Sequence, residues 1–341
     1  MKGKSVQNIC IILFLVLGST VTQAGAAVIN VDANGGGNYS SIQEAVDKAQ
    51  NGDTILVSPG VYQENIKVNK ELIIASDSAP TGKQVNRTYI VGAIPDNDVF
   101  YINSNNVTIE GFYISGGPSE VERQEVGIYL EGVKNCSLSN NTLVLNDMGI
   151  LLSGAQGNYL DSNFVSLGNE GISLINSEAN VLSGNLIVTN NQGISLNNSA
   201  NNTVVNNTAG SNAIGVFLGM SRGNTLAYNT ISKNNYGIRG QNAQSNSLFN
   251  NSVYMNGIGV DLNTSSNNAI YENEFVNFLN AIDDGNNIWN SSLGNFWDNY
   301  TGNDTDGNGI GDIPYVINPT TGSTDYMPLM NVTFSDSEFE K

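Results

Sequence analysis

The sequence has no histidine, and it is poor in cysteine, proline and charged side chains. Without histidine, a Ser-His-Asp triad, a Cys-His dyad, a zincin site and a histidine-bound copper or iron centre are all excluded. Acidic residues outnumber basic ones by 31 to 13, which gives a net charge of −18. An acidic surface repels phosphate, so we expect no nucleic-acid or anionic-membrane partner.

Residues 1–27 have the layout of a secretory signal peptide. Lys2 and Lys4 precede the apolar run Ile9–Leu17, and the small residues 24–27 offer a cleavage site. The alternative, a retained membrane anchor, is disfavoured because the run is shorter than the ~20 residues that a bilayer span needs. We therefore expect a secreted, cell-surface or periplasmic protein with no transmembrane anchor after cleavage. Cys136 would be the one remaining cysteine, so disulfides do not hold the fold together.

Glycine and asparagine, in contrast, are abundant and recur every 22 residues. The glycine column is Gly127, Gly149, Gly171, Gly193, Gly215, Gly237 and Gly259. One asparagine column is Asn141, Asn163, Asn185, Asn207, Asn229, Asn251, Asn273 and Asn295, and a second is Asn158, Asn180, Asn202, Asn224, Asn246, Asn268 and Asn290. Apolar and polar residues alternate within each unit over short runs, which is strand periodicity. The repeat predicts an all-β solenoid, a single-stranded parallel β-helix with 22-residue coils.

Stacked coils place equivalent side chains in columns about 4.8 Å apart. We expect Ile128 and its equivalents through Ile282 to stack inside, with the column from Leu130 to Leu262 beside them. Asparagine suits the turns because it tolerates left-handed backbone angles and its amide can hydrogen-bond to the coils above and below. The asparagine columns are therefore interpreted as structural ladders in preference to ligand sites.

The two ends of the solenoid should be capped. Ser41-Ile42-Gln43-Glu44 is a capping box, and it predicts a short amphipathic helix over the open first coil. Aromatic residues after the last coil predict a C-terminal cap: Phe296, Trp297, Tyr300, Tyr315 and Tyr326. The expected organisation is a signal peptide at 1–27, a cap and irregular coils at 28–105, regular coils at 106–297, and a C-terminal cap with an acidic tail at 298–341.

One segment is too long for the 22-residue register. The stretch from Ser115 to Val126 exceeds it by about seven residues, so we expect a protruding loop. This loop would carry the charged residues Glu120, Glu122, Arg123 and Glu125.

Three groups of residues resemble a known superfamily: the segments 39–66 and 106–114, and the Gly-Ile-x-Leu repeats. They resemble the pectin-lyase-like right-handed parallel β-helices. The ending, residues 294–300 followed by 304–315, is similar to NosD-type, carbohydrate-binding and sugar-hydrolysis repeat proteins of archaeal and bacterial surfaces. The resemblance implies a right-handed parallel β-helix. It also implies a NosD-like part in copper-site maturation, which the absence of histidine disfavours.

An acidic, glycine-rich loop follows the last coil. Asp304, Asp306, Asn308 and Asp312 could turn their oxygens inward, with a backbone carbonyl such as that of Ile310 completing the set. Hard oxygen ligands on a flexible loop are what Ca²⁺ prefers, so these residues are a candidate calcium site. The alternative is an ordinary acidic surface turn. The EF-hand pattern fails because its bidentate glutamate would fall at Tyr315.

A second candidate site lies in the column just outside the core. It comprises Tyr129, Leu151, Ser173, Ser195, Phe217, Arg239, Asp261 and Asp283. Two carboxylates on neighbouring coils would be about 5 Å apart, the separation found in retaining glycosidases, so Arg239, Asp261 and Asp283 are the catalytic candidates. The alternative is a stacked salt bridge, in which Arg239 neutralises Asp261. Aromatic and polar residues on one face also suit a sugar-binding groove.

Three functions remain open at this stage. The first is an exported structural or adhesive surface protein, and the second is a protein that binds a polysaccharide or cell-envelope glycan. The third is a polysaccharide lyase or hydrolase that uses the face with Arg239, Asp261 and Asp283. We expect binding in preference to turnover, because Arg239 would keep Asp261 ionised and leave no general acid.

Overall fold

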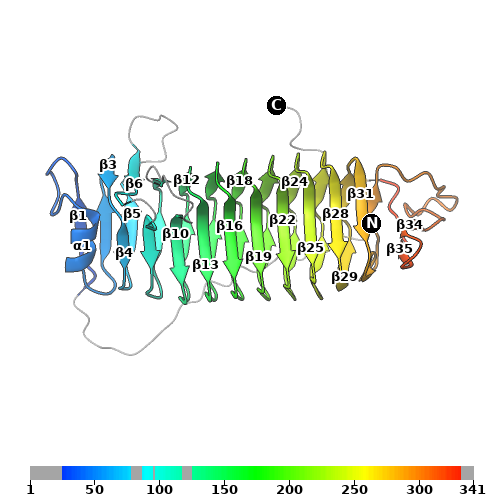
Figure 1. Ribbon diagram of the computed structural model, residues 1–341, viewed down its shortest axis with the longest axis horizontal. Helices are drawn as coiled ribbons and strands as arrows, with labels where there is room; N and C mark the ends of the chain where they lie inside the picture. The colour runs from blue at the N-terminus through cyan, green and yellow to red at the C-terminus, as the bar shows by residue number, and fades with distance from the viewer. Residues whose placement is uncertain (1–24, 78–86, 95–96, 117–124, 332–341) are drawn as a thin grey trace, which may run out of the picture.

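The computed structural model describes residues 25–77, 87–94, 97–116 and 125–331. In this part of the chain the strands stack as successive coils along one axis, with the helix α1 (Ile42–Lys48) at one end and the hairpin of β34 (Tyr315–Asn318) and β35 (Ser323–Asp325) at the other (Figure 1). The strands form three parallel sheets, so the fold is the predicted right-handed parallel β-helix.

Most coils contribute one strand to each of three sheets, called sheets 1, 2 and 3 below. Sheet 1 contains β1 (Val28–Val31), β2 (Thr54–Val57), β5 (Ile73–Ser76), β8 (Thr108–Glu110), β11 (Ser137–Ser139), β14 (Tyr159–Asp161), β17 (Val181–Ser183), β20 (Thr203–Val205), β23 (Thr225–Ala227), β26 (Ser247–Phe249), β29 (Ser266–Tyr271) and β32 (Asn286–Ile288). Sheet 2 contains β4 (Ile66–Val68), β7 (Phe100–Ile102), β10 (Val126–Glu131), β13 (Met148–Ser153), β16 (Glu170–Ile175), β19 (Gln192–Asn197), β22 (Ile214–Gly219), β25 (Tyr236–Gln241), β28 (Ile258–Asn263) and β31 (Leu279–Asp283). Sheet 3 contains β3 (Gly60–Gln63), β6 (Thr88–Val91), β9 (Tyr113–Ser115), β12 (Thr142–Val144), β15 (Phe164–Ser166), β18 (Leu186–Val188), β21 (Thr208–Gly210), β24 (Thr230–Ser232), β27 (Ser252–Tyr254), β30 (Glu274–Val276) and β33 (Phe296–Trp297).

The core is a set of apolar columns inside the three sheets. Along sheet 2, Ile128 pairs with Ile150 and Ile150 with Ile172, in the 22-residue register that the sequence predicts. These side chains are fully buried, as are the leucines two positions later in each coil. Glycine precedes the inward isoleucine because a Cβ at Gly149 would come within 2.6 Å of the Gly171 carbonyl oxygen.

The first predicted asparagine column forms a buried ladder, and so does the second from Asn158 to Asn268, where Asn287 takes the place predicted for Asn290. In a typical step, the Asn185 Nδ2 donates to Asn207 Oδ1 at 2.9 Å and to the Leu160 carbonyl oxygen at 3.0 Å. A third ladder, at the turns between sheets 3 and 2, was not predicted: it contains Asn190, Asn212, Asn234 and Asn256. The glycine at position 168 interrupts that column and conceals its period.

The N-terminal cap forms as predicted, although Glu64 supplies most of the capping hydrogen bonds. The Ser41 hydroxyl accepts from the Glu44 N–H, and the helix buries Ile42, Ala45 and Val46. The Glu64 carboxylate accepts from the backbone N–H groups of residues 42 and 43 and from the Ser41 hydroxyl. Its charge also lies at the positive end of the helix, where it is favourable.

The predicted aromatic cap at the C-terminal end is largely confirmed. Trp297 is buried and stacks between Phe275, at a centroid distance of 4.7 Å, and Tyr315, at 4.3 Å. Trp289 is also buried there, which the sequence did not reveal. Tyr326 does not join the cap, because 64 % of its side chain is exposed.

Two further expectations concern the N-terminal segment and the protruding loop. The segment expected to be a signal peptide lies almost wholly outside the described residues, and so do Glu120, Glu122 and Arg123 of the expected protruding loop. Glu125 was expected on that loop, and this is wrong: its side chain is only 3 % exposed and its carboxylate lies against the Gly116 backbone.

Candidate functional site

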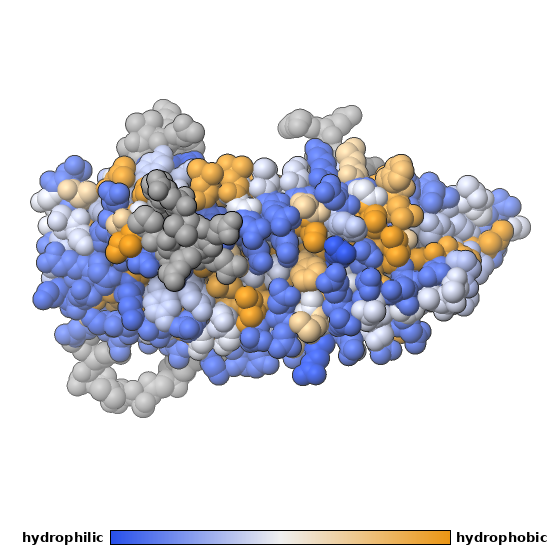
Figure 2. All heavy atoms as spheres, in the orientation of Figure 1, coloured by the Kyte–Doolittle hydropathy of each residue, from blue (hydrophilic) through white to orange (hydrophobic). Residues whose placement is uncertain are grey.

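The outer face of sheet 2 is the surface on which the candidate site was predicted. Its central column runs in register from Tyr101 through Tyr129, Leu151, Ser173, Ser195, Phe217 and Arg239 to Asp261. The six-residue strands of this sheet are longer than most strands of sheets 1 and 3, so each coil presents more than one outward side chain here. Figure 2 shows that one face of the molecule is mostly hydrophilic, with hydrophobic side chains in separate clusters.

The first part of the column carries an aromatic pair. The rings of Tyr101 and Tyr129 meet edge to face with centroids 5.6 Å apart, and the Lys67 ammonium lies 5.4 Å from the centre of the Tyr101 ring. The Tyr101 hydroxyl donates to Glu131, and this hydrogen bond raises the pKa of Tyr101 to about 12. Tyr101 and Lys67 were not predicted, because the coils before residue 106 depart from the 22-residue period. Glu131 was not singled out although its coil is regular.

The middle of the column is built from small polar residues. Ser173 and Ser195 point outward but are completely covered by their neighbours. Three buried polar atoms there have no hydrogen-bond partner in the described structure: Glu170 Oε2, Ser173 Oγ and Gln192 Oε1. A buried polar group without a partner costs about 1–3 kcal/mol, so a water or ligand molecule that hydrogen-bonds to these atoms would stabilise this part of the face.

The last part of the column contains the predicted ion pair. Arg239 Nε lies 3.4 Å from Asp261 Oδ2 without hydrogen-bond geometry, and Nε is buried without a partner. The guanidinium also lies 4.6 Å from the centre of the Tyr236 ring. Burial raises the pKa of Asp261 and outweighs the opposing effect of Arg239. Arg239 favours the ionised form, in the expected direction, and the ionised state of Asp261 at neutral pH stays a prediction.

The predicted place of Asp283 in this column is wrong. The last coil is one residue shorter, so Asp261 pairs with Ile282, and Asp283 follows Leu262 into the core. Asp283 is fully buried and accepts hydrogen bonds from the Gly285 N–H, Asn287 Nδ2, Trp289 Nε1 and Ser323 Oγ, at 2.8–2.9 Å. It fixes the C-terminal cap, and it cannot form a catalytic pair with Asp261 on the surface.

The carboxylates of the acidic loop accept hydrogen bonds from the loop's own residues. Asp304 accepts from the N–H groups of residues 307, 308 and 309, and these bonds lower its pKa, the one from Gly309 most of all. Asp306 accepts from Asn308, and Asp312 from Thr305. Within the described residues, no three acidic, histidine or cysteine side chains converge as a metal site would require. Calcium binding at Asp304, Asp306, Asn308 and Asp312 stays a prediction.

A family model described as periplasmic copper-binding protein (NosD) matches residues 46–219 and 103–302 of this chain. A cell surface glycoprotein of Methanothermus fervidus is 37 % identical over 136 residues. That match covers 39 % of this chain and 20 % of the glycoprotein, so the chain spans about a fifth of that relative's length.

Solved structures of similar fold include a mannuronan epimerase, a pectate lyase and a viral protein. The mannuronan C-5 epimerase AlgE6 A-module of Azotobacter vinelandii is 15 % identical with a TM-score of 0.54, over 74 % of this chain and 86 % of that one. Pectate lyase Pel9A is 14 % identical with a TM-score of 0.57, over 77 % and 79 %. ORF18 of Geobacillus virus E2 is 13 % identical with a TM-score of 0.59, over 74 % and 56 %. Such low identities show the fold alone.

The donor groups of the described residues do not fit a copper site. The sequence has no histidine, and Cys136 is buried in the core, where burial raises the pKa of its thiol. Met148 is buried at the start of β13, whereas Met220 and Met255 are exposed on turns at different sheet junctions. The sulfur atoms of Cys136, Met148, Met220 and Met255 therefore do not form a common soft-ligand site, and the sequence supplies no imidazole. No helix in the described ranges is both long and apolar enough to cross a membrane.

Proposed function

The chain belongs to the NosD family, and from that premise we propose that it is a cell-surface β-helix protein whose outer face on sheet 2 binds carbohydrate without cleaving it. The similarity to a cell surface glycoprotein supports the location. The rigid stack of coils supports a structural or adhesive role, because it holds the binding face in one conformation.

The unpaired polar atoms of the outer face carry this proposal. Glu170 Oε2, Ser173 Oγ, Gln192 Oε1 and Arg239 Nε are buried without partners and belong to side chains on this one surface. They comprise carboxylate and amide acceptors, a hydroxyl that donates and accepts, and a cationic donor, which together match a row of sugar hydroxyls. The Tyr101–Tyr129 pair on the same face adds apolar area against which a sugar ring can pack.

The position of Asp283 favours binding over hydrolysis. Glycosidases need two carboxyl groups that flank the scissile bond, one of them protonated. Asp283 is in the core, so Asp261 has lost the partner that the sequence suggested. Burial favours a proton on Asp261, but the neighbouring Arg239 favours the ionised form. A single carboxyl beside a cation suits recognition of a hydroxyl or a ring substituent.

The test is binding and turnover of acidic and neutral polysaccharides by three variants. We expect Arg239→Gln and Gln192→Leu each to weaken binding of a polysaccharide that the wild type retains, by about tenfold, because each removes a charged or polar partner. Arg87→Gln makes the same charge change away from sheet 2 and should leave binding unchanged. Binding that neither outer-face variant affects would remove the site. Product release that Arg239→Gln abolishes would show an enzyme instead.

A further inference from the structure

A polar groove lies on a different surface, at the turns that lead from sheet 2 to sheet 1. It has a volume of about 530 Å³ and crosses four successive coils. One wall carries Asn176, Asn198 and Met220, and the other carries Glu178, Ala200 and Arg222. A site of this size holds a small molecule. The outer-face site does not include any of these residues, so the groove is a separate feature.

The second wall places opposite charges on either side of a gap. Glu178 pairs with Ala200, and Ala200 with Arg222, through parallel backbone β-bridges, so the three residues lie on consecutive coils. At about 4.8 Å a coil, Glu178 and Arg222 begin about 10 Å apart. The methyl group of Ala200 leaves the space between them open. Among the described residues the one ion pair is that of Arg239 and Asp261, so Glu178 and Arg222 do not form an ion pair with each other.

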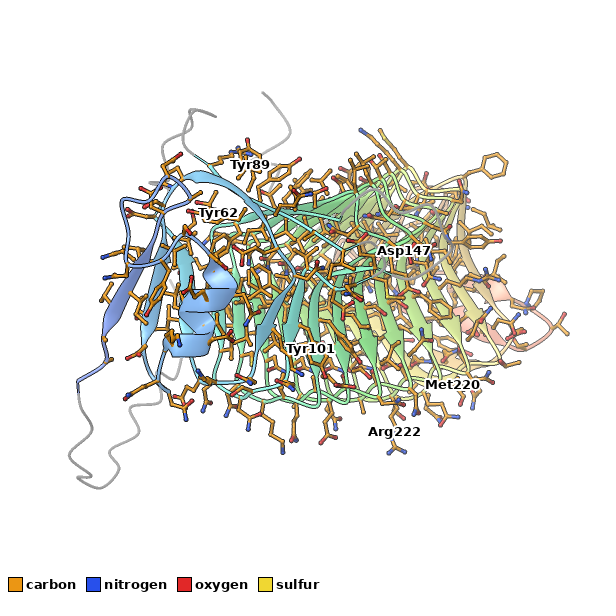
Figure 3. All side chains as sticks on the ribbon, turned by 60° about the vertical axis from the view of Figure 1, so that its left-hand side comes forward. Tyr62, Tyr89, Tyr101, Asp147, Met220 and Arg222 are labelled. Carbon is orange, nitrogen blue, oxygen red and sulfur yellow. The ribbon has the colours of Figure 1, made fainter. Side chains whose placement is uncertain are left out.

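Both charged groups are available to a ligand. Gln156 Nε2 donates to Glu178 Oε1 at 2.8 Å, which orients the carboxylate and leaves Oε2 for another donor. Met220 and Arg222 lie on the same edge of the coil stack, and Arg222 extends outward from it (Figure 3). Met220, 63 % exposed, interrupts an otherwise polar wall, in which Asn198 Nδ2 donates to Asn176 Oδ1 at 2.6 Å. The groove thus combines an anion, a cation and one apolar contact.

We propose that this groove binds a zwitterionic α-amino acid, with its ammonium on Glu178 and its carboxylate on Arg222. Two charge-assisted hydrogen bonds of about 2.8 Å and the span from the ammonium nitrogen to a carboxylate oxygen add up to about 9 Å. Glu178 and Arg222 side chains that extend in parallel from the wall would hold their charged groups at the coil separation of about 10 Å, which this length matches. A guanidinium binds a carboxylate through two parallel hydrogen bonds, and the apolar part of the ligand packs on Met220. A purely anionic ligand would leave Glu178 unneutralised.

The experiment titrates the full chain with L-alanine, N-acetyl-L-alanine and L-alaninamide, followed by NMR. The acetyl derivative lacks the ammonium and the amide lacks the carboxylate, so the wild type should bind L-alanine at least about tenfold more tightly than either. Glu178→Gln should abolish the preference over the acetyl derivative, and Arg222→Gln the preference over the amide. Ala200→Gln fills the gap with a side chain already present in this column, and it should abolish binding.

Lys134→Gln is the matched control, because Lys134 occupies the same column outside the groove. It removes the same charge as Arg222→Gln and should leave the affinity for L-alanine unchanged. Equal affinity for the three probes, no binding of L-alanine, or an equal loss in Lys134→Gln and Arg222→Gln would each overturn the proposal. Polysaccharide binding on sheet 2 is measured separately with the Arg239 variant, so failure at one site is distinguishable from failure at the other.

Discussion

Asparagine has two roles in this chain, and the position in the coil decides which one applies. Asn206 is exposed and has a φ of 56°, a left-handed backbone angle that asparagine adopts at lower cost than most residues. Asn207, the next residue, is buried and accepts hydrogen bonds from both the N–H and the Nδ2 of Asn185. The first role fixes the direction of the chain, and the second joins one coil to the next.

Asn207→Leu should therefore destabilise the fold strongly. Leucine has a similar size but removes the acceptor of the Asn185 N–H and of one Asn185 Nδ2 hydrogen, and it removes the side-chain donor to the Leu182 carbonyl oxygen. Each such group costs about 1–3 kcal/mol, so we expect a loss of about 3 kcal/mol or more in the free energy of unfolding, measured by urea denaturation. Asn191→Leu is the matched control at an exposed amide, and its effect should stay within about 0.5 kcal/mol. Equal effects of the two changes would contradict the ladder.

At the scale of strands and turns, the sequence predicts the fold well wherever coils keep one length. The 22-residue period gave the correct register for Ile128, Ile150 and Ile172, because stacking forces equivalent residues onto the same side. The last coil has one residue fewer, and a shift of one residue moves every side chain to the opposite face. Because Ile282 continues the isoleucine column at a spacing of 22 residues, the period predicted that Asp283 points outward. Its actual hydrogen-bond partners include Ser323, 40 residues later, which a local repeat cannot reveal.

The site was harder to predict than the fold. Arg239 and Asp261 were found because both lie in regular coils and pair in register. Tyr101 was missed, because its coil is of irregular length. The groove between Glu178 and Arg222 was missed for a different reason. Its residues are ordinary turn residues, and the gap exists because the small side chain of Ala200 lies between the two charged ones.

The acidic loop is the element on which the calcium prediction is tested. If Asp304, Asp306, Asn308 and Asp312 bind Ca²⁺, the ion stabilises the folded state by mass action, so a chelator should lower the melting temperature of the wild type. Asp306→Ala should remove this response, whereas Asp47→Ala, on the exposed side of α1, should retain it. A wild type that does not respond to chelation would leave these residues as a turn held by its own backbone hydrogen bonds.

At the scale of the whole molecule, a stack of coils needs a cap at each end, because an open end exposes unpaired strand edges. The C-terminal end is closed by two buried carboxylates, each held by a tryptophan. Asp283 accepts from Trp289 Nε1 at 2.8 Å and Asp325 from Trp297 Nε1 at 2.9 Å. Asp325 also accepts from the N–H of Asn295, the last member of its ladder. The hairpin is thereby joined directly to the amide ladder of the coils.

This arrangement makes the C-terminal cap sensitive to pH, with a sign opposite to that of most carboxylates. Burial raises the pKa of Asp325 despite its hydrogen bonds, so the folded state holds this proton more tightly than the unfolded chain does. The stability that protonation contributes is fully present below the pKa of an unfolded aspartate, about 3.9, and is lost as the pH rises through the higher folded-state pKa.

Asp325→Asn cannot titrate. The free energy of unfolding of the wild type minus that of Asp325→Asn should therefore increase as the pH is lowered from 7 toward 4, in urea denaturation at each pH. Asp47→Asn, which changes an exposed carboxylate, should not reproduce this trend. A difference for Asp325→Asn that is constant or decreases toward pH 4 would show that the hydrogen bonds outweigh burial, and that the carboxylate closes the stack as a stable anion.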